Sequence, residues 1–273
     1  MRRLVQSLQV VITFVILGLF AFPFLWVILT SIRPERGMYT DSFRLLPEAV
    51  TLDNYRQLVN SGFLVYIRNS VMVSLISTFI TVFFAILAAY AFSRYRFKGR
   101  NGLAGTFAFT QLFPFAVLLM PLYIMYFRVG LVNSFLGLII AYVAITLPFC
   151  VYMLIGYFQT VSISLDEAAR IDGCSTLGII FRVIFPVAWP GVVATSVYAF
   201  VRSWEEYLFA LTLMTDDSKK TVPVGLANFF GQYTTAWGSV MTASVIATVP
   251  TMIFFLIMQK QLVSGLAAGA VKQ

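Results

Sequence analysis

Charged side chains that could do chemistry are gathered in two groups in this sequence. The groups are Asp166, Glu167, Arg170 and Asp172, and Arg202, Glu205 and Glu206. The chain has no histidine, and its two cysteines, Cys150 and Cys174, have no neighbour at metal-ligand spacing. Because histidine is the commonest general base and metal ligand, we expect no catalytic residue and no metal site. The charged groups therefore predict ion pairs, helix ends and polar contacts.

The overall composition predicts a membrane protein. Of 273 residues, 60% are hydrophobic and 11% are charged, whereas soluble domains carry about 25% charged residues. A soluble core could not absorb this much apolar surface, so the excess must face lipid. The net charge of +8 is spread over many short loops. That distribution argues against nucleic-acid binding and fits cationic loops beside anionic lipid headgroups.

Six apolar stretches are long enough to cross a membrane, which takes about 20 residues. They are Val10–Ile32, Asn69–Phe92, Leu103–Phe127, Phe135–Phe158, Gly191–Met214 and Val240–Met258. The first stretch is too long for a signal peptide and is expected to be a retained helix. Segment 33–68 has mixed charge with proline and glycine, and predicts an extracytoplasmic excursion with short helices.

One short loop indicates the orientation. Ser93–Gly102 contains Arg94, Arg96, Lys98 and Arg100 and no acidic residue. Short loops rich in lysine and arginine mark the cytoplasmic side of a membrane protein. We therefore expect both chain termini and the long polar loop at 159–190 to be cytoplasmic.

The polar loop at 159–190 has the pattern of a helix start. Ser164 and Glu167 form a capping box, in which Ser164 caps the helix and Glu167 reaches back to the free amide. Asp166 lies four residues before Arg170, so these two side chains are expected to pair on one helix face.

The same loop also contains a helix stop. Asp172 and Gly173 end the first helix, because glycine tolerates a positive φ. A second, amphipathic helix is expected to begin near Ser175 and to end before Pro186. The loop thus predicts two short helices joined by a tight turn.

Two adjacent small residues on the first loop helix, Ala168 and Ala169, indicate an approach surface. Alanines on a short exposed helix let another protein come close to the backbone, so the helix could fit a groove in a partner. The alternative is a helix that lies on the membrane surface. The residues alone leave both interpretations open.

The loop resembles the "EAA" loop of binding-protein-dependent ABC importer permeases, through the run Glu167–Gly173 followed by Phe181 and Pro186. Other segments match the carbohydrate-uptake branch in order: Asn54-Tyr55, Asn69-Ser70, Met120–Tyr123, Gly130-Leu131, Gly137–Ile140, Pro148-Phe149, Trp204–Leu208 and Gly265–Lys272. The departures from the family pattern are Ser164, Cys174 and Glu205. The chain is most similar to the second permease subunit of maltose-type systems.

The resemblance implies the type I ABC importer permease fold, with six transmembrane helices and a coupling helix that docks on a cytoplasmic ATPase. The ATPase-coupling residues it implies are Ser164, Asp166, Glu167, Ala168, Ala169, Arg170, Asp172 and Gly173. A C-terminal tail at 260–273, with Gly265, Gly269 and Lys272, would also reach the ATPase. The alternative for this tail is a disordered terminus. The implied organisation is a first helix and outer segment at 1–68, a core permease domain at 69–259, and the tail.

Family resemblance also implies the partners. They are two copies of the ATPase, a second permease subunit in a heterodimer, an extracytoplasmic binding protein, a carbohydrate substrate (an oligosaccharide or disaccharide) and membrane lipid. The chain has no GxxxxGK[ST] phosphate loop. ATP and Mg²⁺ are therefore expected on the partner ATPase, with no cofactor on this chain. A non-enzymatic transport subunit in the cytoplasmic membrane of a prokaryote is expected.

The second charged group lies within the fifth apolar stretch. Arg202 is about 17 Å along a helix from Gly191, near mid-membrane, where charges often mark a pathway. Both acids are spaced to reach this arginine on one face. The candidate residues of a translocation path are Arg202, Trp204, Glu205, Glu206 and Tyr207. The alternative is a self-neutralising ion pair that fixes helix packing.

Two other classes of membrane protein fit the sequence less well. A stand-alone secondary carrier or channel usually has isolated acids or histidines at mid-membrane, often in repeated halves. This chain has no histidine, shows no clear repeat and offers its arginine two acids. A membrane-embedded enzyme would need a metal cluster or a nucleophile–base arrangement, and neither is visible.

Overall fold

The computed structural model describes residues 2–38, 46–47, 49–112, 114–231 and 235–270, with the backbone alone for 2–5, 8, 36–37 and 261–270. Helices dominate these residues, and an isolated antiparallel bridge joins Phe230 to Thr235. Within the described ranges, four helices are long and apolar enough to cross a membrane, or up to six if each bent helix pair is one span. The predicted all-α membrane class is confirmed.

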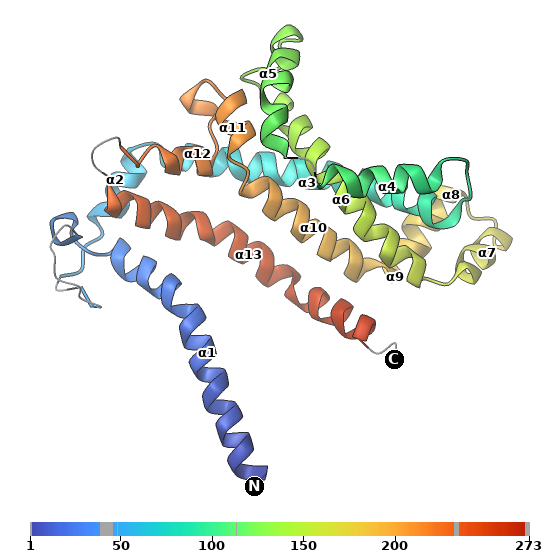
Figure 1. Cartoon of the computed structure of the whole chain (residues 1–273), viewed down its shortest axis with the longest axis horizontal. Helices are drawn as coiled ribbons and strands as arrows, with labels where there is room; N and C mark the ends of the chain where they lie inside the picture. The colour runs from blue at the N-terminus through green and yellow to red at the C-terminus, as the bar shows by residue number, and fades with distance from the viewer. Residues whose placement is uncertain (1, 39–45, 48, 113, 232–234, 271–273) are drawn as a thin grey trace. The chain divides into compact units, whose positions relative to one another are not determined.

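Figure 1 shows the helices in chain order. They are α1 (Arg2–Ser31), η1 (Glu35–Met38), α2 (Asp53–Asn60), α3 (Phe63–Arg94), α4 (Arg100–Thr110), η2 (Phe115–Leu118), α5 (Leu119–Arg128), α6 (Phe135–Thr160), α7 (Ile163–Ile171), α8 (Thr176–Gly178), the π-helix η3 (Ile179–Ile184), α9 (Phe185–Val187), α10 (Trp189–Trp204), α11 (Leu208–Leu213), η4 (Asp217–Lys219), α12 (Val222–Ala227) and α13 (Trp237–Ala270).

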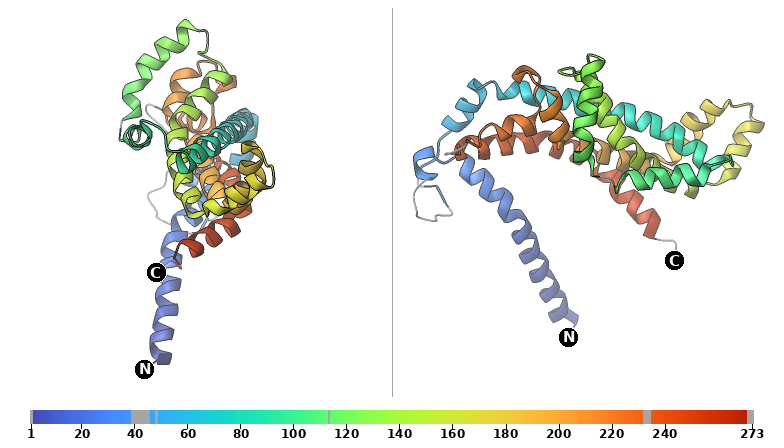
Figure 2. Two further views of the ribbon diagram at one scale, coloured as in Figure 1. Left: turned by 90° about the vertical axis from the view of Figure 1, so that its right-hand side faces the viewer. Right: turned by 45° about the horizontal axis from the view of Figure 1, so that its top comes forward.

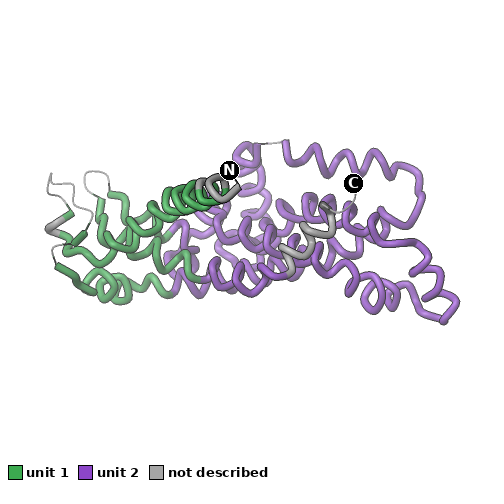
Figure 3. Tube along the Cα trace, turned by 90° about the horizontal axis from the view of Figure 1, so that it is seen from below, with its two compact units in different colours: residues 1–64, 225–249 green, residues 65–224, 250–273 purple. Residues whose placement is uncertain are grey.

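The chain divides into two compact units, which Figure 3 shows in different colours. Unit 1 holds residues 1–64 and 225–249. In it, the Asn54 amide of α2 donates hydrogen bonds to the carbonyl oxygens of Ser31 (2.9 Å) and Arg33 (2.8 Å). These bonds satisfy carbonyls at the end of α1, where no further turn of helix supplies donors. The segment that follows α1 contains short helices, as predicted.

Unit 2, residues 65–224 and 250–273, contains the site discussed below. Helices α3, α6 and α10 pack around a buried apolar cluster. The hydroxyl groups of Thr81 on α3 and Thr146 on α6 share a hydrogen bond of 3.0 Å inside it. Where α10 approaches α6, Gly191 faces the Tyr157 ring so closely that a Cβ atom would overlap it. Small residues allow this kind of close helix approach in membranes.

Two of the six predicted spans are broken in the structure. The stretch predicted as Leu103–Phe127 forms α4 and the η2–α5 segment, because Pro114 is extended and has no amide hydrogen to continue a helix. The stretch predicted as Gly191–Met214 forms α10 and the short α11, with a break between Trp204 and Leu208. The other four predicted spans are continuous helices.

The polar loop lies at one end of unit 2. Figure 1 and the right view of Figure 2 show α7 beyond the C-terminal ends of α3 and α6. The loop helices α8, η3 and α9 then lead back to α10, with a bend of 87° where α10 begins. The C-terminal ends of α3 and α6 and the N-terminal end of α7 therefore lie together.

Candidate functional site

Helix α7 begins earlier than predicted. Ser162, in an extended conformation, is its cap, and its hydroxyl accepts a hydrogen bond of 3.3 Å from the amide of Ser164. The prediction that Ser164 caps the helix is therefore wrong, because Ser164 already lies inside the first turn. Glu167 does not reach back to close a capping box: it is exposed and makes no hydrogen bond among the described residues.

Helix α7 ends where the sequence predicted. Gly173 has a φ of +79° and follows the C-cap residue Asp172. The amide of Cys174 donates to the Ala169 carbonyl (2.9 Å), and the amide of Gly173 donates to the Arg170 carbonyl (3.0 Å). This pair of bonds is a Schellman motif, which satisfies the last carbonyls of a helix and favours glycine at the left-handed position. The predicted glycine stop is confirmed.

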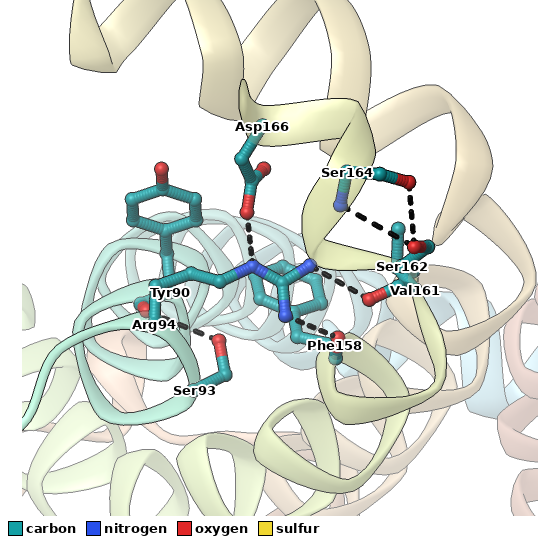
Figure 4. A network of polar contacts seen from close by, with 8 residues as sticks. All are labelled: Tyr90, Ser93, Arg94, Phe158, Val161, Ser162, Ser164 and Asp166. Atoms are coloured by element: carbon teal, nitrogen blue, oxygen red, sulfur yellow. Dashed lines mark hydrogen bonds and ion pairs between the residues drawn. The ribbon is translucent and has the colours of Figure 1, made fainter. Parts of the chain in front are cut away.

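The most buried polar contact of the loop joins α7 to α3. Asp166 forms an ion pair with Arg94, and the two side chains are 3% and 4% exposed. The Arg94 guanidinium also donates hydrogen bonds to the carbonyl oxygens of Phe158 (3.1 Å) and Val161 (3.0 Å), as Figure 4 shows. One side chain thus connects the end of α3, the end of α6 and the start of the loop.

The expected pairing of Asp166 with Arg170 is wrong. Asp166 points into the protein, where a carboxylate needs a charged or hydrogen-bonding partner, and Arg94 supplies it. Arg170 is exposed and lies near Tyr90 and Tyr95 at the end of α3. The spacing of four residues allowed the local pair, but the burial of Asp166 selects the distant arginine.

The two alanines of α7 face different surroundings. Ala169 is 6% exposed and belongs to the apolar core of unit 2, whereas Ala168 is exposed. The expectation that both alanines are available to a partner is therefore corrected for Ala169. A short side chain at this position lets α7 pack closely on the core beneath it.

Apolar side chains that sequence reasoning missed form the outer surface of α7. Ile163 is 58% exposed and Ile171 is 87% exposed, with the exposed Glu167 between them at spacings of four. Residues four apart lie on one line along a helix. The spacing of these isoleucines was the available signal. A line of exposed apolar residues on a polar loop marks an interaction surface.

The second loop helix is longer than predicted. It begins after Ser175, whose hydroxyl accepts a hydrogen bond of 3.2 Å from the Gly178 amide. It then continues through the π-helix η3 and past Pro186 to Val187, so the predicted end before the proline is wrong. Pro186 lies in the last turn of this continuous helix, where its missing amide hydrogen removes one bond but the amide of Ala188 still donates to the Ile184 carbonyl (2.8 Å).

In the second charged group, Arg202, Glu205 and Glu206, the two acids have different partners. Arg202 pairs with Glu205 at 2.9 Å, and the two side chains are 44% and 54% exposed. The Glu206 carboxylate instead accepts hydrogen bonds from the amides of Phe209 (2.9 Å) and Ala210 (3.1 Å). The expectation that both acids serve the arginine is thus wrong for Glu206, because carboxylates cap free amides at a helix start.

The aromatic members of this group also differ in exposure. Trp204 is 8% exposed and stacks on Phe200, whose ring lies 4.2 Å from that of Phe254. Its ring is therefore part of the packing of unit 2. Tyr207 is partly exposed. The role of Arg202, Trp204, Glu205, Glu206 and Tyr207 in a path stays a prediction.

A comparison with protein families identifies the class of the chain. Residues 81–267 match the family described as the binding-protein-dependent transport system inner membrane component. The chain belongs to this family. It is therefore a multi-pass protein of the inner membrane and a transport permease.

Related proteins match this permease over nearly its whole length. It is 38% identical to the trehalose/maltose transport system permease protein MalG of Thermococcus litoralis, over 92% of this chain and 91% of the relative. It is 36% identical to the sulfoquinovosyl glycerol transport system permease protein SmoH of Agrobacterium fabrum, over 92% of this chain and 88% of the relative. One chain in a crystal structure of a bacterial ABC transporter for alginate import matches this permease with a TM-score of 0.81 and 21% identity. The match covers 95% of this chain and 97% of that chain. The predicted type I ABC importer permease fold is confirmed.

The C-terminal segment of the permease is helical as far as Ala270. Gly265 and Gly269 lie on this last part of α13, where the backbone alone is described. Lys272 lies outside the described residues. Contact of this tail with an ATPase stays a prediction.

Proposed function

We propose that this permease is one subunit of an ATP-driven importer and translocates a carbohydrate, an oligosaccharide or disaccharide, by alternating access. Family membership supports the transport role. The names of the related permeases MalG and SmoH concern trehalose, maltose and a sulfosugar glycoside, which supports the substrate class. The alternative of a stand-alone carrier or channel has no observation in its favour.

The observation that carries this proposal is the exposed line of Ile163, Glu167 and Ile171 on a helix whose opposite face is fixed to the membrane bundle. An apolar helix face with one charge at its centre suits a groove on a second protein. In this proposal the partner is a cytoplasmic ABC ATPase. Ala168 packs on the ATPase surface, and Glu167 makes the polar contact.

The proposed assembly contains two copies of the ATPase, a second permease subunit and an extracytoplasmic binding protein. ATP and Mg²⁺ are bound by the ATPase. In this proposal the N- and C-termini and the loop at 159–190 are cytoplasmic. The cationic segment Ser93–Gly102 supports this orientation, because lysine and arginine residues in short loops favour the cytoplasmic side. When the ATPase subunits close, the docked helices move together and the bundle opens outward.

Replacement of Ile171 by arginine tests the docking surface. The permease would be purified with the ATPase, second permease and binding protein encoded in its genomic neighbourhood, and ATPase affinity would be measured. A charged side chain at the most exposed apolar position of α7 should weaken docking by about 30-fold, the effect of losing a hot spot of about 2 kcal/mol.

Val59→Arg is the matched control, since Val59 is 49% exposed on α2 in the segment assigned to the opposite side of the membrane. We expect this variant to bind the ATPase like the wild type. Equal binding by wild type and Ile171→Arg would refute the docking surface. Uptake of radiolabelled maltose and trehalose into proteoliposomes tests the substrate class, and no ATP-dependent uptake of any sugar tried would count against a carbohydrate permease.

A further inference from the structure

Few side chains of α7 are buried. Of the α7 residues, Asp166 and Ala169 are buried in the described structure, and the others are exposed. Ala169 contributes one methyl group, which permits close packing but does not hold a direction. The contact between Asp166 and Arg94 is therefore the buried polar contact that orients α7 on the bundle, and Arg170 lies near Tyr90 of α3 at the surface beside it.

The Arg94 guanidinium contacts three groups at once. It faces Asp166 through one nitrogen and the carbonyl oxygens of Phe158 and Val161 through the other two. Figure 4 shows the guanidinium between the end of α6 and the first turn of α7. The planar fork of arginine fixes these directions at once, which the flexible ammonium of lysine does not. The ends of α3 and α6 and the start of α7 thus form one rigid junction.

Stability alone does not account for such a pair. Burying two charges is costly, and well-packed apolar residues of similar volume often give equal or greater stability. What a buried, hydrogen-bonded pair adds is a fixed geometry. At this position, the fixed geometry ties α7 to the ends of α3 and α6.

We infer that Arg94 and Asp166 are positioning residues that transmit the displacement of α7 to α3 and α6, and so set how much transport each ATP hydrolysis produces. This inference rests on the proposed function, because the displacement comes from the docked ATPase. Neither residue touches the transported sugar or the nucleotide. Without the pair, the ATPase still docks on Ile163 and Ile171, but its movement is partly lost in the loop.

The test uses the complete importer in proteoliposomes and measures sugar transported per ATP hydrolysed. The variants are Arg94→Ala, Asp166→Asn and the double variant Arg94→Met with Asp166→Leu. The double variant removes both charges and keeps apolar volume, so it protects the fold if a single variant leaves a charge unpaired. Arg96→Ala is the matched control, since Arg96 is an exposed arginine two residues after Arg94, in the segment that follows α3.

We expect the double variant to keep ATPase at wild-type stoichiometry while its transport per ATP falls by about 2- to 30-fold, the range for residues that couple two sites. The single variants should show the same fall, and Arg96→Ala should match the wild type. Wild-type transport per ATP in the double variant would overturn the inference, and so would loss of the ATPase from it. If the wild-type complex itself fails to couple hydrolysis to uptake, the proposed function fails instead.

Discussion

Replacement of Gly173 by alanine isolates the backbone requirement at the end of α7. The φ of Gly173 is +79°, and a Cβ atom there would meet nothing within 4 Å. The cost of alanine is therefore the left-handed conformation alone, about 1–2 kcal/mol, with no contribution from a clash. Asparagine tolerates this conformation better, so Gly173→Asn should cost less.

This cost falls on the Schellman motif that closes α7. A penalty of about 1–2 kcal/mol shifts the equilibrium between the closed and frayed helix end by about 5- to 30-fold. The amide of Cys174, which donates to the Ala169 carbonyl at 2.9 Å, is freed each time the end frays. Its hydrogen exchange should therefore accelerate by the same factor in Gly173→Ala.

Gly99→Ala provides a control with equal backbone strain. Gly99 precedes α4, has a φ of +85° and also has open space around its missing Cβ. Exchange measured by mass spectrometry on peptides covering α7 should change in Gly173→Ala and not in Gly99→Ala. Binding-protein-stimulated ATP hydrolysis should fall only in Gly173→Ala. Unchanged exchange in α7, or an equal loss of stimulated hydrolysis in both variants, would refute this reasoning.

Thermal unfolding of the detergent-solubilised permease checks two further predictions. Gly191→Ala should lower the free energy of unfolding by about 1–3 kcal/mol, because the new methyl group would overlap the Tyr157 ring. Gly102 lies on α4, and a Cβ atom added there would meet nothing within 4 Å. Gly102→Ala should therefore be neutral or stabilising by up to about 1 kcal/mol. An equal loss of stability in Gly191→Ala and Gly102→Ala would contradict the packing argument. Glu206→Ala should cost about 1–2 kcal/mol through the lost cap of α11. Glu205→Ala removes only a half-exposed ion pair and should cost less than about 1 kcal/mol. A larger loss of stability in Glu205→Ala than in Glu206→Ala would contradict the assignment of Glu206 as the helix cap.

Local features of the loop were predictable because their causes are local. The left-handed position at Gly173 depends on the residue type and its few neighbours, and the predicted helix stop is confirmed. The helix start was predicted wrongly at Ser164, because the residue type of a cap does not show where the preceding chain turns. The extended turn that follows α6 selects Ser162.

The helix breaks show a different limit. Hydropathy detected the fifth apolar stretch but not the break between α10 and α11. The length of an apolar stretch does not show where the backbone hydrogen bonds of a helix stop. Glu206 captures the amides of Phe209 and Ala210, which starts a new helix after the break. The acid was visible in the sequence, but its choice of amides over Arg202 depends on how the chain turns.

The sequence by itself determined the membrane class, the approximate spans and the EAA-like loop, because hydropathy, glycine conformation and family motifs are properties of short segments. Only the tertiary structure decided which side chains of that loop face inward. Asp166 could pair with Arg170 one turn away, yet it lies against Arg94 from another helix. A buried carboxylate takes the partner that the packed helices bring to it, and no spacing along the chain reports that packing.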